Sequence, residues 1–175
     1  MLLKVKKLEL KTCEFLSKLP FCFISRVLLL VFIFPNFIWA KVDLVQVVEK
    51  LQYPWAMDFL PGSEALVTEK PGRLQKVNLE TGEKTEIQNL PEVHAVGQGG
   101  LLDVMVHPDN KQNQKIFLTF SAPLNASGDA TTTLISARLE GQQLSDQKIL
   151  FQADPALPGG HHFGSRVRMA QDGML

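Results

Sequence analysis

The feature that most constrains the fold is a series of short apolar-rich segments, each closed by a turn that contains Pro or Gly. They recur about every ten residues, which is the pattern of an all-β protein. Five segments come first, at residues 43–48, 56–59, 65–69, 73–78 and 84–88. Four more follow at residues 100–106, 115–121, 131–139 and 144–152, and another begins at residues 166–169. Because no segment after residue 40 has a convincing helical period, the sequence predicts an all-β fold.

A longer repeat indicates which all-β fold this is. Residues 55–67 and 104–117 both run strand, Pro-containing turn, strand, and residues 167–175 begin a third copy. The spacing is about 50 to 60 residues, a little above the ~40–50 residues of a propeller blade, and insertions in surface loops would explain the excess. A β-sandwich is the alternative, but it does not explain the recurrence. Propellers close with about four to eight blades, so we expect a truncated N-terminal part with about two blades and the start of a third.

The first 40 residues differ from the rest. They hold six Lys or Arg against two Glu, so that residues 41–175 keep 12 basic and 16 acidic residues of the 18 and 18 in the chain. This mildly acidic body argues against a nucleic-acid partner. An apolar run at residues 27–40 follows the basic part and ends in Ala40, as in a signal peptide, and is shorter than the ~20 residues that span a bilayer. An uncleaved membrane anchor is the alternative.

We therefore expect residues 1–40 to be removed and residues 41–175 to be exported, with no stable membrane anchor after cleavage. N-terminal sequencing of exported protein should begin at Lys41. Intact Met1 on protein in the membrane would favour the anchor. Both cysteines, Cys13 and Cys22, lie in this leader, so the mature part would have neither a disulfide nor a cysteine metal site.

Two glycine-rich stretches carry the candidate chemistry. In the first, AVGQGGLLDVMVHPD at residues 95–109, Gln98 lies on a glycine loop before a buried strand that His107-Pro108 ends; loops held by rigid strands often contact ligands, although many glycine turns serve geometry alone. In the second, residues 159–166, His161 and His162 precede another strand. Imidazole accepts protons near neutral pH, and adjacent side chains on an extended segment point in opposite directions. Exposed loop histidines or a zinc pair are the alternatives.

Three motifs in order, PWAMDFLPGSEALVTEKPGRL, GQGGLLDVMVHPD and GGHHFGSRV, resemble the soluble aldose sugar dehydrogenases, also called glucose/sorbosone dehydrogenases. The resemblance covers nearly all of residues 51–175. It implies a six-bladed β-propeller that binds pyrroloquinoline quinone with calcium, oxidises sugars in the periplasm and passes electrons to an external acceptor. The quinone's basic partners and the calcium ligands would lie beyond residue 175, so the chain by itself is expected to be inactive.

Site residues follow from the resemblance by position. His162 matches the general base on the sugar hydroxyl, and Gln98 matches a glutamine that lines the quinone and substrate pocket. Arg166 is assigned only support of the loop. His161 stands where glucose-specific relatives have an acidic residue, which leaves the preferred sugar open. The alternatives to an enzyme are a non-enzymatic secreted propeller that binds a protein or glycan, and a solute-binding or structural all-β domain.

Overall fold

A computed structural model describes residues 2–5, 43–125, 128–156 and 158–175 of the chain. Residues 46–175 belong to one compact unit, and its all-β character confirms the predicted fold class. The signal peptide predicted for residues 1–40 lies outside the described residues apart from a short strand, β1 (Leu2–Val5), that pairs with β2 (Leu44–Val48). Among the described residues, no helix has the length and apolar character needed to cross a membrane.

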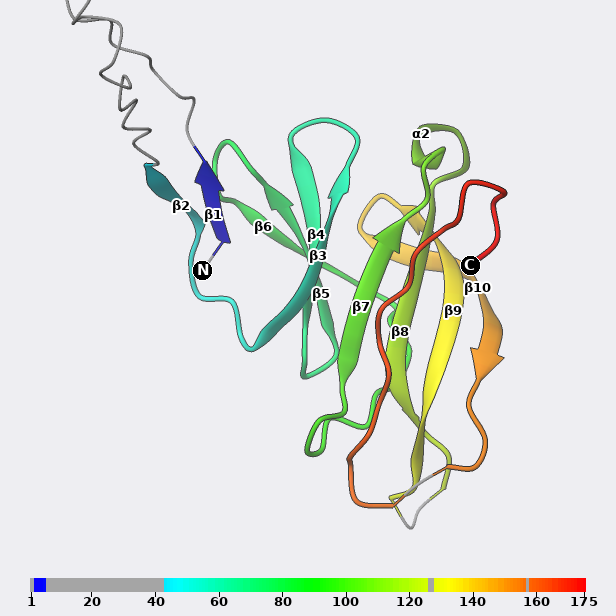
Figure 1. Cartoon of the computed structure of the whole chain (residues 1–175). Helices are drawn as coiled ribbons and strands as arrows, with labels where there is room; N and C mark the ends of the chain where they lie inside the picture. Colours follow the sequence, from blue (N-terminus) through cyan, green and yellow to red (C-terminus); the bar gives the residue numbers. More distant parts are fainter. Residues whose placement is uncertain (1, 6–42, 126–127, 157) are drawn as a thin grey trace, which may run out of the picture. The chain divides into compact units, whose positions relative to one another are not determined.

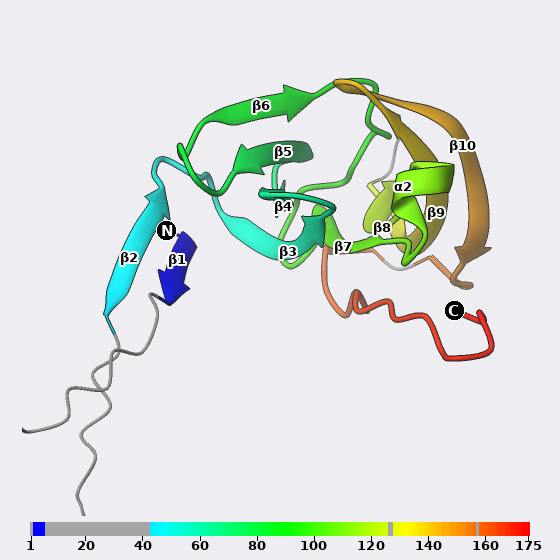
Figure 2. The ribbon, with the colours of Figure 1, turned by 90° about the horizontal axis from the view of Figure 1, so that it is seen from above.

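Eight strands form two four-stranded antiparallel sheets in which each strand pairs with the next along the chain (Figure 1). The first sheet contains β3 (Pro54–Leu60), β4 (Glu64–Glu69), β5 (Arg73–Asn78) and β6 (Lys84–Ile87). The second contains β7 (Leu101–Val106), β8 (Lys115–Pro123), β9 (Ala130–Glu140) and β10 (Gln143–Gln152). Within residues 46–175, β3 and β4 of the first sheet contact β7 of the second, as Figure 2 shows from above. Successive meanders that meet at their first strands are the arrangement of propeller blades.

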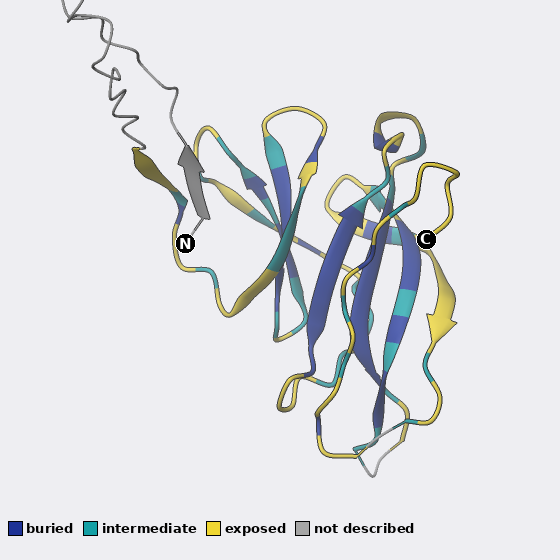
Figure 3. Cartoon of the chain, in the orientation of Figure 1, coloured by how far each residue is buried: buried dark blue, intermediate teal, exposed yellow. Residues whose placement is uncertain are grey.

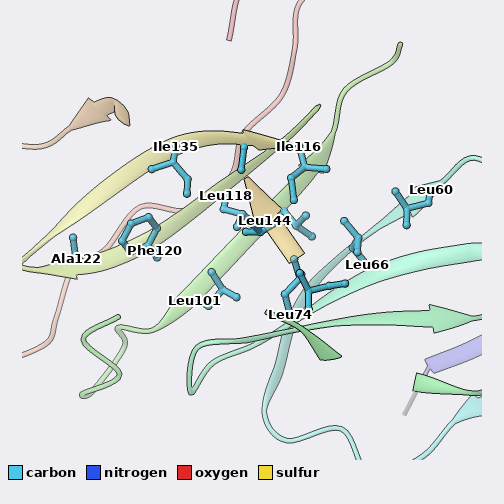
Figure 4. Close-up of a cluster of buried hydrophobic side chains, with 13 residues drawn as sticks. Leu60, Leu66, Leu74, Leu101, Ile116, Leu118, Phe120, Ala122, Ile135 and Leu144 are labelled. Carbon is cyan, nitrogen blue, oxygen red and sulfur yellow. The ribbon is translucent and has the colours of Figure 1, made fainter. Parts of the chain in front are cut away.

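The main core lies between the two sheets. It joins side chains from all eight strands, among them Leu66 and Leu74 of the first sheet and Leu101 and Leu118 of the second (Figure 4). Alternation along β8 sends Phe117 to the opposite face of its sheet, where it packs with Met105 and Val167. The second sheet is therefore covered on both faces, and its strands β7 and β8 are almost entirely buried (Figure 3).

Two segments differ in type from the predicted elements. Residues 107–114, predicted as a loop, include one helical turn, α2 (Asn110–Asn113), which is too short to leave a periodic pattern in the sequence. Residues 166–169 are not a strand. This segment runs along β7, but part of its backbone hydrogen-bonds to side chains and not to a neighbouring strand. The N–H of Val167 donates to Asp103 Oδ2 (2.8 Å), and the carbonyl oxygen of the preceding Ser165 accepts from Thr119 Oγ1 (2.7 Å).

Candidate active site

The two glycine-rich stretches meet at one end of the second sheet, where the loop that leads into β7 lies beside the segment that follows β10 (Figure 1). The backbone N–H of Gln98 donates to the carbonyl oxygen of Gly160 at 2.7 Å. The side-chain oxygen of Gln98 in turn accepts from the backbone N–H of His162 at 2.9 Å. Two residues that the sequence selected separately, 64 positions apart, are therefore hydrogen-bonded to each other.

This close approach depends on glycine at both contact points. Gly97 and Gly160 have φ values of 58° and 68°, in the left-handed region that residues with a Cβ rarely adopt. A Cβ on Gly97 would overlap the carbonyl oxygen of Gly160, and a Cβ on Gly160 would lie 2.7 Å from the carbonyl oxygen of Val96. The glycines thus allow one backbone to lie directly on the other.

The turn between β4 and β5 holds the Gln98 loop from the other side. Lys70 Nζ donates to the carbonyl oxygen of Gly97, and the carbonyl oxygen of Lys70 accepts from the N–H of Leu101 at 3.1 Å. The sequence had indicated only a turn at Lys70. Its role could not be predicted, because it depends on how the two sheets stack.

The histidine pair departs from one expectation. His162 has a φ of 65°, so the segment is not extended there, and the alternation that was expected to separate the two side chains does not apply. The ring centroids of His161 and His162 lie 6.2 Å apart, with the rings tilted by 57°. Both residues are exposed. Either imidazole can therefore meet a ligand from solution, and backbone direction does not exclude His161.

Arg166 reaches back to the strand that follows Gln98. Its Nη1 lies 3.5 Å from Oδ1 of Asp103, while 62% of its own side chain stays exposed. Asp103 is a polar residue within the strand that follows Gln98, and it is 2% exposed. A buried carboxylate needs partners. A charged residue inside a strand predicted to be buried was therefore the sequence signal that could have indicated Asp103 as a residue with long-range contacts.

A second buried carboxylate, Glu69, is the last residue of β4 and directly precedes Lys70. Glu69 is 2% exposed, and it accepts hydrogen bonds from the N–H of Gln52, from Arg73 Nε (2.8 Å) and from Gln75 Nε2 (3.2 Å). Burial by itself would raise the pKa of Glu69. The three hydrogen bonds and the charge of Arg73 outweigh burial and lower that pKa below its ordinary value of 4.5.

We expect Glu69→Gln to lower the free energy of unfolding by about 1.5–3 kcal/mol at pH 7, the range for hydrogen bonds to a charged group. Because the pKa of Glu69 is lower in the folded state, its carboxylate stabilises the fold fully when the pH is above the unfolded-state pKa. This stabilisation is lost as the pH falls through the folded-state pKa. The difference from wild type should therefore shrink between pH 5 and pH 3 in denaturant titrations. The control is Glu64→Gln, which removes a more exposed pair with Lys76 (3.3 Å) and should cost about 0–1 kcal/mol. Equal losses in the two variants at pH 7 would contradict the assignment.

One open hollow of about 300 Å³ is lined by Pro54, Trp55, Ala56, Met57, Val67 and Arg166, so that only the last residue of the second glycine-rich stretch reaches it. Neither Gln98 nor His162 contributes to it. The candidate active site is therefore defined by the hydrogen-bonded loops and their exposed side chains and not by a cavity.

The exposed groups fit part of what the resemblance implies. The imidazole of His162 and the amide of Gln98 supply a proton acceptor and hydrogen-bond donors, which suit a sugar hydroxyl or a quinone oxygen. Lys70 is a cation bonded to this loop, but its Nζ already donates to the carbonyl oxygen of Gly97. Within the described residues, no group of three or more His, Cys, Asp or Glu side chains could hold a metal ion. The described residues therefore supply exposed polar groups that suit a sugar hydroxyl or a quinone oxygen.

Comparison with known proteins agrees with the fold and the motifs. The family model "Glucose / Sorbosone dehydrogenase" matches residues 51–175. The chain is 34% identical over 139 residues to the aldose sugar dehydrogenase YliI of Escherichia coli. A crystal structure of a glucose dehydrogenase superposes with a TM-score of 0.69 at 35% identity, over 74% of this chain and 38% of that one. The pyrroloquinoline quinone-bound aldose sugar dehydrogenase of Streptomyces coelicolor gives 0.61 at 28% identity, over 73% and 37%.

The two stacked meanders and these structural neighbours define the chain as part of a β-propeller sugar dehydrogenase fold. The chain belongs to the glucose/sorbosone dehydrogenase family, which confirms the resemblance seen in the sequence. The matched region is 78% of this chain and spans 37% of the length of the E. coli relative. The number of blades in the ring and the roles of His162 and Gln98 stay predictions.

Proposed function

We propose that the full-length protein oxidises aldose sugars with pyrroloquinoline quinone as cofactor. The observation that carries the proposal is the hydrogen bond between Gln98 and His162, which brings together the two residues expected in the site. Family membership and a neighbour solved with the quinone bound support the same reaction. Calcium, an external electron acceptor and export to the periplasm or cell exterior belong to this proposal.

The described residues have definite tasks in such a reaction. Oxidation of a sugar hydroxyl to a carbonyl removes the hydroxyl proton and a hydride from the carbon. The imidazole of His162 accepts the proton, while Gln98 holds the backbone at His162 and so limits where the ring can lie. When bound, the quinone would supply the hydride acceptor. Lys70 fixes the Gln98 loop and takes no part in the proton transfer.

The test is an assay of the purified full-length protein with aldoses and a reducible dye, after incubation with pyrroloquinoline quinone and calcium. We expect dye reduction that needs both the quinone and a sugar. Quinone binding, followed by its absorbance, should saturate. If the quinone binds but no aldose is oxidised, the proposed reaction is wrong. If neither quinone nor sugar has an effect, a non-enzymatic propeller that binds a protein or glycan becomes the better hypothesis.

A further inference from the structure

Asp103 is a carboxylate in the middle of an otherwise apolar strand, β7, and its partners lie almost entirely on the segment that carries His162. Oδ2 accepts from the N–H of Val167 at 2.8 Å. Arg166 Nη1 lies 3.5 Å from Oδ1, and Arg168 Nη1 lies 3.9 Å from Oδ2. Only 2% of Asp103 is exposed, so losing these partners would leave a buried charge uncompensated.

The neighbouring strand adds a second tie to the same segment. The N–H of Asp103 donates to Thr119 Oγ1 at 3.0 Å, and Thr119 Oγ1 donates to the carbonyl oxygen of Ser165 at 2.7 Å. Because residues 165–168 form no strand, these side chains replace the ladder bonds that would otherwise order the backbone. The apolar contact of Val167 with Met105 and Phe117 fixes the same stretch from its other side.

The bonds from Gln98 and from Asp103 to the His162 segment are in register. Gln98 bonds the backbone N–H of His162, and Asp103 bonds the backbone N–H of Val167; in each pair the residues are 64 positions apart. Residues 98–103 and 162–167 therefore run alongside each other in the same direction, joined at both ends. With His162 tied at one end, only Phe163 and Gly164 lie before the next tied residue, Ser165, and Val167 follows two positions later.

We propose that Asp103 is a positioning residue for His162: by holding Val167 and Arg166 against β7, it fixes the far end of the segment whose near end Gln98 holds. Asp103 does not touch the substrate. The effect on turnover rests on the proposed function, whereas the effect on the segment does not.

The chain offers a matched control in Asp58. Its Oδ2 accepts from the N–H of Val106 at 2.7 Å, so it joins β3 to β7 by the same kind of bond, without any contact to the His162 segment among the described interactions. Asp103→Ala leaves the backbone N–H of Val167 without its carboxylate, and Asp58→Ala leaves those of Val106 and of the adjacent Phe59. The two variants differ in which segment is released.

The experiment combines amide hydrogen exchange, followed by mass spectrometry, with steady-state kinetics of the full-length protein. In Asp103→Ala we expect exchange across residues 160–169 to rise about 10- to 100-fold, the range for losing a hydrogen bond to a charged group, and kcat to fall at least about tenfold with little change in KM. Asp103→Asn keeps an acceptor for Val167 but loses the charge that faces the arginines, so it should lie between Asp103→Ala and wild type. Asp58→Ala should raise exchange around Val106 and spare residues 160–169.

Three results would overturn the proposal. The first is unchanged exchange across residues 160–169 in a folded Asp103→Ala or, should that variant not fold, in Asp103→Asn. The second is an equal rise in Asp58→Ala, which would indicate general loosening. The third is a released segment with unchanged kcat. If the wild-type protein oxidises no sugar, the proposed function fails, and the exchange arm still decides whether Asp103 holds the segment.

Discussion

Replacing His162 by alanine is expected to lower kcat for sugar oxidation by about 10²–10⁴-fold, the usual contribution of a general base. The backbone N–H that binds Gln98 remains in this variant, so the loop keeps its tie and only the imidazole is lost. Quinone binding, measured by absorbance titration with calcium present, should change little. Stopped assays with saturating sugar and an artificial acceptor would measure the loss directly.

The backbone at His162 calls for a second variant. With a φ of 65°, this position favours residues that tolerate the left-handed region, among which Asn is prominent. His162→Asn should therefore keep the loop geometry at least as well as alanine, yet lose turnover to the same extent. The neighbouring His161→Ala removes an imidazole that is also exposed and lies 6.2 Å away, and we expect it to cost less than about tenfold. Near-normal kcat in both His162 variants would show that this imidazole is not the base.

Much of the sheet architecture could be predicted because it is encoded locally. The predicted strand at residues 73–78 coincides with β5 (Arg73–Asn78), since turn residues on each side leave little choice of boundary. The start of β3 was predicted less well: the predicted segment begins at residue 56, but the strand begins at Pro54. β3 is an edge strand, and at the first residue of an edge strand a missing N–H costs no ladder bond.

The site could be predicted by residue but not by contact. The sequence selected Gln98 and His162 separately, and the glycines around each indicated that other groups approach the backbone. Nothing local indicates that the amide of Gln98 binds the backbone of His162, because the contact arises from stacking consecutive blades. The same holds for Asp103 and Lys70, whose partners lie 64 and 27 positions away. Residues that position a site through long-range backbone contacts carry little sequence signal of their own.

The glycine contact between the two loops gives the other large expected effect. Gly97→Ala should lower the free energy of unfolding of the full-length protein by about 2–4 kcal/mol, combining backbone strain with overlap against a rigid carbonyl group. The added methyl group would push the backbone of Gly160 away. It would thereby break the 2.7 Å bond between Gln98 N–H and Gly160 and stretch the bond between Gln98 and His162. We therefore expect kcat to fall at least about tenfold, since small displacements of a catalytic group cost large factors in rate.

Gly141→Ala separates the two causes. Gly141 has a φ of 65°, close to the 58° of Gly97, but an added Cβ there meets no heavy atom within 4 Å. Its replacement should cost only the conformational term, about 1–2 kcal/mol, and should leave kcat at the wild-type value. Denaturant unfolding and kinetics of the two variants would then give the cost of the overlap by difference. If both variants lost the same stability and kept the wild-type kcat, the spacing of the two loops would not matter for the reaction. The bond between Gln98 and His162 would then not set the position of the imidazole.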